Sequence, residues 1–109
     1  MVACELAPEL LKEVSRRRES APVPCKVNCS MREWFAKLEE EVTEAHEAAV
    51  LYENGLQHKR FIADELTDVI TVCTSFLEAI GYNEHERMAV QRRVNEKNQR
   101  RGYCSKAAL

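Results

Sequence analysis

The 109-residue sequence lacks several features that mark common protein classes. It has no apolar run approaching the ~20 residues that a membrane-spanning helix needs, and no hydrophobic signal core near its first residue. Strand signals and internal repeats are also missing. The sequence has 16 basic and 18 acidic residues, and the resulting net charge of -2 creates no strong field that would favour nucleic acid. These absences predict a cytoplasmic protein that binds neither membrane nor nucleic acid.

Cysteine usage excludes a regular disulfide framework. The five cysteines are an odd number at irregular spacing, which favours a reducing cytosol. Cys25 and Cys29 form a CxxxC pattern, but the second half of a zinc site is missing, so structural zinc is disfavoured. Cys73 lies on an apolar helix face, and we expect it in the core.

What the sequence does contain is typical of one small all-α domain. Charged residues make up 31% and hydrophobic residues 45% of the chain. Two capping boxes, S-x-x-E at residue 30 and N-x-x-E at residue 83, each predict a helix start. Glycines at 55, 81 and 102 predict helix ends. We therefore expect long helices over 30–53, about 57–80 and 83–100.

This pattern divides the chain into three parts. Residues 1–29 are predicted to form a short N-terminal helix and a linker, because Pro8 suits a first helical turn and two prolines break any helix later. Residues 30–103 form the helical domain, and residues 104–109 a flexible tail. Helices of more than 20 residues fit an antiparallel helical bundle.

Two pairs of acidic residues stand out in the two longest predicted helices. Glu41 and Glu44 form one pair, Glu65 and Asp68 the other, and residues three apart share a helix face. If the helices fold back at Gly55, residues whose numbers add to 109 lie level, and both 44 with 65 and 41 with 68 satisfy this register. Four converging carboxylates would repel one another unless some stay protonated or a divalent cation binds.

The apolar faces of the two helices show how the acids are oriented. The predicted apolar face of the first helix is Trp34, Phe35, Leu38, Val42, Ala45, Ala49 and Tyr52. That of the second is Ile62, Leu66, Val69, Ile70, Cys73, Phe76, Leu77 and Ile80. Glu41 falls inside the first face, whereas Glu39 and Glu47 point away. An acid in a core-facing position is costly without a partner, so a metal site is favoured over a solvated charged helix.

Near the end of the third predicted helix, Lys97 and Arg101 are four residues apart and share a face. Cations in a last helical turn usually complement the helix dipole. Beside a metal site they are candidate phosphate contacts, since both side chains bind phosphate.

Three long helices leave more apolar surface than so short a chain can cover. We therefore expect a homodimer or homotetramer, in which a second chain completes the bundle.

The sequence also resembles a known superfamily. Glu40-Glu41-x-x-Glu44, followed by Glu65-x-x-Asp68, looks like the EExxE…ExxD signature of the MazG-like all-α NTP pyrophosphohydrolases. The stretches KLEEEVTEA (37–45), ADELTDVIT (63–71) and VNEKNQRRGY (94–103) are similar to the family's helices. Phosphoribosyl-ATP pyrophosphohydrolase and the dimeric dUTPases are related groups. The resemblance covers residues 30 to 103.

The resemblance implies hydrolysis of a nucleoside triphosphate to the monophosphate and pyrophosphate with Mg2+, which Mn2+ could replace. It implies that four acids bind metal, that Glu40 binds the metal through water or orients the attacking water, and that two cations hold phosphates. The metal ligands would be Glu41, Glu44, Glu65 and Asp68, with Glu40 and Glu41 catalytic. The phosphate contacts would be Lys97 and Arg101, and candidate base or sugar contacts are Asn98, Tyr103 and Trp34.

One position departs from the family pattern. Some members have a lysine one turn before the ExxD glutamate, and here that residue is Phe61. Lys59 and Arg60 lie nearby on other faces.

Two other interpretations compete with the enzyme. A non-catalytic helical regulator could bind nucleotide or a protein partner with the same fold, although retention of every expected acid argues against it. A ferritin-like di-iron bundle requires Glu-x-x-His on two helices, and none of the three histidines has Glu three residues before it. We expect these histidines at the surface: His46, His58 and His85. Trp34 is favoured as a core or interface anchor over a base contact.

Overall fold

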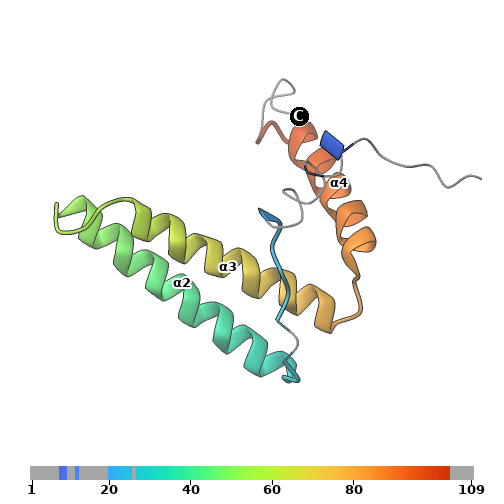
Figure 1. Ribbon diagram of the computed structural model, residues 1–109, viewed down its shortest axis with the longest axis horizontal. Helices are drawn as coiled ribbons and strands as arrows, with labels where there is room; N and C mark the ends of the chain where they lie inside the picture. Colours follow the sequence, from blue (N-terminus) through green and yellow to red (C-terminus); the bar gives the residue numbers. More distant parts are fainter. Residues whose placement is uncertain (1–7, 10–11, 13–19, 26, 104–109) are drawn as a thin grey trace, which may run out of the picture.

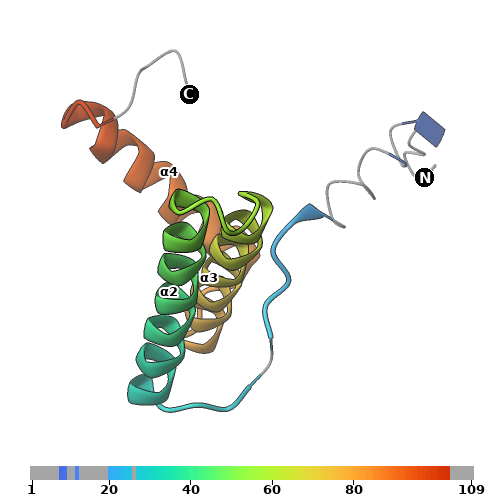
Figure 2. The same ribbon diagram turned by 90° about the vertical axis from the view of Figure 1, so that its left-hand side faces the viewer.

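The computed structural model describes residues 8–9, 12, 20–25 and 27–103. Among these residues it forms the helices α2 (Met31–Glu53), α3 (Arg60–Ala79) and α4 (Glu84–Arg100). The helices α2 and α3 form a long antiparallel hairpin, and α4 leaves the hairpin after α3 (Figures 1 and 2). Within the described residues there is no strand, so the predicted all-α class is confirmed. None of the three helices combines the length and apolarity needed to span a membrane.

The predicted N-terminal helix lies largely, and the tail 104–109 entirely, outside the described residues.

Both predicted capping boxes are present. The Ser30 hydroxyl accepts a hydrogen bond from the Glu33 amide at 3.2 Å, and the Glu33 carboxylate accepts one from the Ser30 amide at 3.0 Å. Asn83 and Glu86 form the same pair of bonds, at 2.9 and 3.2 Å, at the start of α4. Each box satisfies backbone donors that the first helical turn leaves unpaired, which is why the sequence located these two starts correctly.

The turn between α2 and α3 begins with a glycine cap. The Gly55 amide donates to the Tyr52 carbonyl at 3.0 Å and the Leu56 amide to the Leu51 carbonyl at 2.9 Å. This pair of bonds needs a left-handed residue, and Gly55 has a φ of 71°. The helices α3 and α4 end with the same two bonds at their own glycines.

The start of α3 differs from the prediction of about residue 57. The helix begins at Arg60, and its N-cap residue Lys59 makes no side-chain cap bond. In place of a Ser, Thr, Asn or Asp cap, the imidazole Nδ1 of His58 accepts the Arg60 amide at 3.1 Å. Because no standard cap fixes this end, sequence patterns alone could not locate it.

The hairpin is held by the packing of α2 against α3. On α2 the buried residues include Ala45 and Ala48, whose small side chains let the helices approach closely. Trp34 is buried and stacks on Phe76, with ring centroids 5.6 Å apart. Phe35 meets the same ring edge-on at 5.1 Å. These aromatic contacts fix the end of the hairpin distant from the turn.

The predicted apolar face of α3 is only partly turned toward α2. The residues that α3 buries are Val72 and Ser75. Leu66 and Ile70 are 51% and 52% exposed, and Cys73 is exposed rather than in the core. Part of the apolar stripe therefore faces α2, as the stacking of Phe76 on Trp34 shows. The exposed part lies with similarly exposed residues of α2 on one side of the hairpin, the apolar side: Phe35, Val42, Leu66, Ile70, Cys73 and Ile80.

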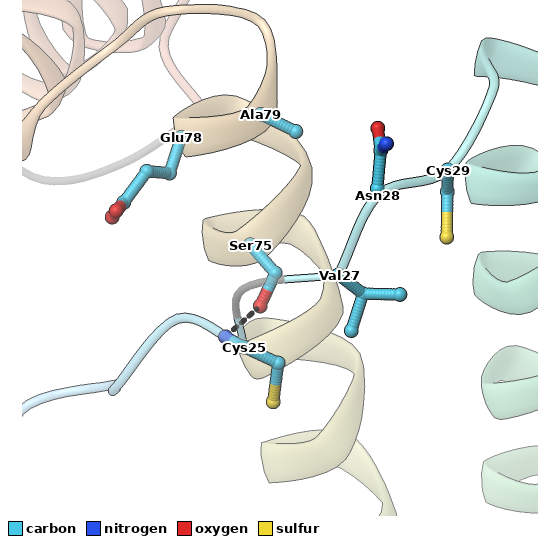
Figure 3. A pocket seen from close by; sticks show the side chains of 7 residues that line it. All are labelled: Cys25, Val27, Asn28, Cys29, Ser75, Glu78 and Ala79. Atoms are coloured by element: carbon cyan, nitrogen blue, oxygen red, sulfur yellow. Dashed lines mark hydrogen bonds between the residues drawn. The ribbon is translucent and has the colours of Figure 1, made fainter.

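The opposite side of the hairpin is crossed by the extended segment that precedes α2. The Cys25 amide donates to the Ser75 hydroxyl at 2.8 Å, and this hydroxyl donates to the Thr71 carbonyl at 2.7 Å. Ser75 is only 2% exposed. Figure 3 shows the segment beside α3, with Cys25, Val27 and Cys29 on one side of the backbone. This alternation is that of an extended chain.

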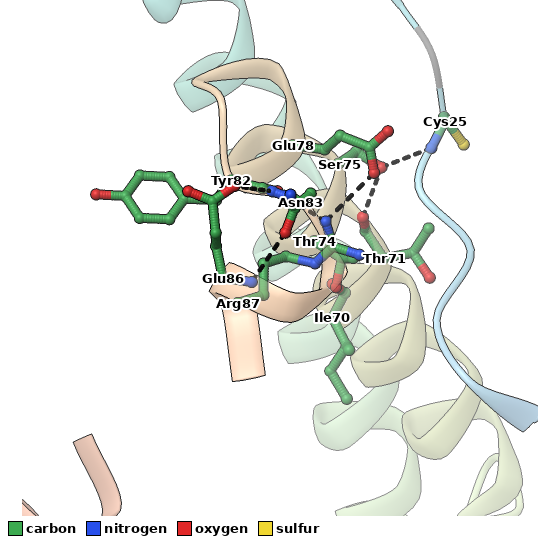
Figure 4. Close-up of polar contacts among 10 residues, drawn as sticks. All are labelled: Cys25, Ile70, Thr71, Thr74, Ser75, Glu78, Tyr82, Asn83, Glu86 and Arg87. Atoms are coloured by element: carbon green, nitrogen blue, oxygen red, sulfur yellow. Dashed lines mark hydrogen bonds and ion pairs between the residues drawn. The ribbon is translucent and has the colours of Figure 1, made fainter. Parts of the chain in front are cut away.

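The angle between α3 and α4 is set at their turn. The Arg87 guanidinium contacts the Glu78 carboxylate at 3.3 Å and donates to the Tyr82 carbonyl at 2.8 Å (Figure 4). Beyond this turn α4 buries no residue, and the hairpin contains the extensive helix–helix contact of the described residues. One chain thus provides a hairpin and a splayed third helix, and completion of a bundle by other copies stays a proposal.

The bond between Cys25 and Ser75 gives a testable prediction. Ser75→Ala removes the acceptor for the Cys25 amide, at a cost of about 1 kcal/mol. Amide hydrogen exchange at Cys25 should therefore become roughly five- to tenfold faster. Thr74→Ala is the matched control, because the Thr74 hydroxyl donates to the Ile70 carbonyl at 2.9 Å in the same way but does not contact the segment. Equal exchange rates in the two variants would show that Ser75 does not hold the segment.

Candidate metal centre

Three of the predicted acids converge at the middle of the hairpin. One carboxylate oxygen each from Glu41, Glu44 and Glu65 lies within 4.8 Å of the other two. Glu41 and Glu44 come from adjacent turns of α2, and Glu65 projects from α3 at the level of Glu44. The antiparallel register inferred from residue numbers therefore places these side chains together.

Burial makes this arrangement costly without a ligand. Glu41 is 8% exposed, and its Oε2 atom has no hydrogen-bond partner within the described chain. The Oε2 atom of Glu65 is buried and unpartnered in the same way. Buried polar atoms are nearly always satisfied, so two orphaned carboxylate oxygens in one cluster are an unfavourable arrangement that a positively charged partner would relieve.

Part of the required charge comes from Lys37, one turn before Glu41. Its Nζ atom lies 3.3 Å from the Oε1 atom of Glu41, and its side chain is half exposed. The hydrogen bond with Glu41, followed by the charges of Glu40 and Glu41, raises the pKa of Lys37. The ammonium thus contacts one oxygen of Glu41 and leaves the inner oxygen unpaired.

The repulsion within the cluster affects the pKa of Glu44. The nearby Glu41 carboxylate raises the pKa of Glu44, and partial burial and Glu65 act in the same direction. The ionised cluster is therefore unfavourable in the metal-free protein.

The donor set fits a hard divalent cation. All three side chains offer carboxylate oxygens, which suit Mg2+ and Mn2+, and the cluster contains no imidazole or thiolate that would favour zinc. The histidines at 46, 58 and 85 are exposed, as predicted, and none joins the cluster. The orphaned oxygens of Glu41 and Glu65 are the atoms that such an ion would satisfy.

Asp68 and Glu40 border the cluster without joining it. Asp68 is exposed and lies one turn beyond Glu65 on the same face of α3. By the hairpin register it is level with Glu41, but its carboxylate is not part of the group of three. Glu40 is exposed on the preceding position of α2.

The predicted phosphate and base contacts are not near the acids of the same chain. Lys97 and Asn98 belong to α4, Arg101 is its C-cap residue and Tyr103 follows. This end of α4 lies away from the hairpin (Figures 1 and 2). Trp34 instead belongs to the hairpin and is buried against Phe76.

Two contacts near the site were not predicted from the sequence. The Lys37–Glu41 pair has a recognisable signal, since Lys and Glu four residues apart share a helix face. The Cys25–Ser75 contact joins residues fifty positions apart and has no periodic signal.

Comparison of the chain with protein-family models, with curated proteins and with solved structures finds no match. The family resemblance therefore depends on the motifs themselves and on their placement in the fold.

The repulsion at Glu44 predicts a pH-dependent stability. The pKa of Glu44 is raised in the folded protein, so ionisation destabilises the fold as pH rises through that pKa. Glu44→Gln mimics the protonated acid and should raise the metal-free melting temperature at pH 7, by roughly 2 °C. The difference should vanish below about pH 4, where the acid is protonated in both states.

Thermal melts of the wild type, Glu44→Gln and Glu47→Gln at both pH values, with chelator, test this prediction. Glu47 is exposed on α2, so Glu47→Gln removes the same charge outside the cluster. Equal stabilisation by both variants at pH 7 would indicate a general charge effect instead of local repulsion.

Proposed function

We propose that the chain is a Mg2+-dependent nucleotide pyrophosphohydrolase that cleaves a nucleoside triphosphate to monophosphate and pyrophosphate. The observation that carries the proposal is the convergence of Glu41, Glu44 and Glu65 with two buried carboxylate oxygens unpaired. This convergence occurs in the motif order that resembles the MazG-like enzymes. If the acids of α2 were only solvated surface charges, Glu41 would be exposed, whereas it is buried.

The chemistry of phosphoanhydride hydrolysis fits these residues. The reaction needs little covalent help, but the phosphate charge must be neutralised and a water must be aligned for in-line attack. Mg2+, when bound, supplies the charge neutralisation, and Mn2+ could replace it. Glu41, Glu44 and Glu65 would hold the ion, with Asp68 as fourth ligand. Glu40, exposed beside them, would orient the attacking water and accept its proton.

The phosphate clamp would come from a second copy. Lys97 and Arg101 share a face of α4, which leaves the hairpin of its own chain and buries no residue. The apolar side of the hairpin offers a surface on which another copy can pack. We therefore propose a homodimer or homotetramer whose sites combine the hairpin of one chain with α4 of another. Asn98 and Tyr103, beside the clamp, would contact base or sugar.

Activity of site variants tests the enzyme. Glu41→Gln and Asp68→Asn should each lower pyrophosphate release at least ~100-fold, because each removes a charged metal ligand. Release is measured over a panel of canonical and modified nucleoside triphosphates, with Mg2+ and with chelator. Glu39→Gln is the matched control, since Glu39 is exposed on α2 outside the cluster.

The outcomes distinguish a wrong metal-ligand assignment from a wrong enzyme proposal. Full activity in Glu41→Gln would refute the site assignment, and full activity in Asp68→Asn alone would leave a three-acid centre. If no triphosphate releases pyrophosphate with the wild type, the enzyme proposal fails for these substrates.

Complementation tests the shared site. Glu41→Gln and the double variant Lys97→Ala/Arg101→Ala should each be inactive alone. Co-expression should restore about a quarter of wild-type activity, because random pairing makes half of the dimers mixed and each mixed dimer has one intact site of two. Without restoration, each clamp must serve the acids of its own chain, which would require α4 to fold back.

A further inference from the structure

A cavity of about 440 Å³ lies between the extended segment and both helices of the hairpin. Its walls include Cys25, Val27 and Cys29 from the segment, Trp34 and Lys37 from α2 and Val72 from α3. The segment residues alternate along the chain, and Figure 3, which draws a neighbouring pocket that shares these three residues, shows their side chains directed away from Ala79. One wall of the cavity is therefore built by a part of the chain that lies outside the family-like motifs.

The lining suits a flat, largely apolar group. Val27, Val72 and the two thiols offer apolar surface, and Trp34 contributes an aromatic ring. The indole N–H of Trp34 is buried, so Trp34 offers the cavity part of its ring and not its N–H donor.

The cavity and the candidate metal centre share a turn of α2. Lys37 and Glu40 line the cavity, and Lys37 also contacts the Glu41 carboxylate at 3.3 Å. One helical turn spans about 5.4 Å, so a molecule with its phosphates at the cluster has its other end within reach of the cavity. Lys37 lies between the cavity and the carboxylate cluster, where its ammonium group would be close to the phosphates of a bound nucleotide.

The cavity also stays accessible in the proposed assembly. Phe35 and Val42 each follow a buried residue of α2 by one position, whereas Glu40, which lines the cavity, precedes the buried Glu41 by one position. Residues displaced in opposite directions around a helix lie on opposite sides. A second copy packed on the apolar side would leave this cavity open.

We propose that the cavity receives the nucleoside of the triphosphate whose phosphates lie at Glu41, Glu44 and Glu65, with Trp34 as a base contact. This inference rests on the proposed function and adds a base-binding wall formed by Cys25, Val27 and Cys29. Specificity for the base would then depend on the segment before α2 as well as on α4.

The thiols of the wall provide the test. The wild-type protein is alkylated with iodoacetamide, and labelling of each cysteine is followed by peptide mass spectrometry. The probe is a mixture of the canonical ribo- and deoxyribonucleoside triphosphates with Mg2+. Cys25 and Cys29 should be labelled at least ~10-fold more slowly with the probe, since a bound base covers them. Exposed Cys73, on the apolar side, is the internal control. Inorganic triphosphate with Mg2+ has no base and should not protect.

A cavity-filling variant gives a second measurement. Val27→Trp places a large ring in the cavity from an exposed position and should abolish protection of Cys25 and Cys29 by the probe. The rise in melting temperature caused by Mg2+ alone should persist, because the carboxylates are unchanged. Val23→Trp is the matched control, because Val23 is also exposed in the same segment but lies outside this cavity.

The outcomes distinguish this inference from the proposed function. Pyrophosphate release without protection of Cys25 and Cys29 would overturn the inference and leave the enzyme standing. Base-dependent protection without release from any triphosphate would support the cavity and refute the enzyme. Equal protection by inorganic triphosphate, or equal slowing at Cys73, would overturn the inference, since phosphate binding or association of copies would then explain the effect.

Discussion

The repulsion among three carboxylates in the seam between α2 and α3 is the constraint on which the rest depends. The packing that brings the helices together, through Ala45 and Ala48, also brings Glu41, Glu44 and Glu65 together. The seam cannot separate the acids without losing its apolar contacts. Lys37 relieves one oxygen, and the inner oxygens stay unpaired. Packing energy thus maintains a concentration of negative charge that a divalent cation can stabilise.

Sequence patterns predicted the features that local interactions determine. The capping boxes and the glycine at 55 located α2 and the turn, and the turn then fixed the register of the acids. The orientation of α3 could not be read in the same way. Its apolar stripe is wide, and periodicity does not show which part faces α2 and which faces another partner, so Cys73 was placed in the core wrongly. The contact of Cys25 with Ser75 depends on tertiary packing alone.

The two sides of the hairpin differ in chemistry. One side exposes aliphatic and aromatic residues such as Phe35 and Ile70, and the other carries Lys37, Glu40 and the extended segment. In the proposed enzyme the two sides have different roles. Other copies pack on the first side, and the nucleotide binds on the second. The acids lie in the seam between them, where both sides influence their position.

The splayed helix α4 is capped at both ends in the single chain, although it buries no residue. It has a capping box at its start, a glycine cap at its end and an arginine that ties its first turns to Glu78 of α3. A segment that folded only on association would lose backbone entropy at that step. Here the backbone is already ordered, so docking of α4 in the proposed assembly costs mainly rigid-body freedom and side-chain rotamers. Weak contacts along a thin apolar stripe can then be sufficient to position its cations.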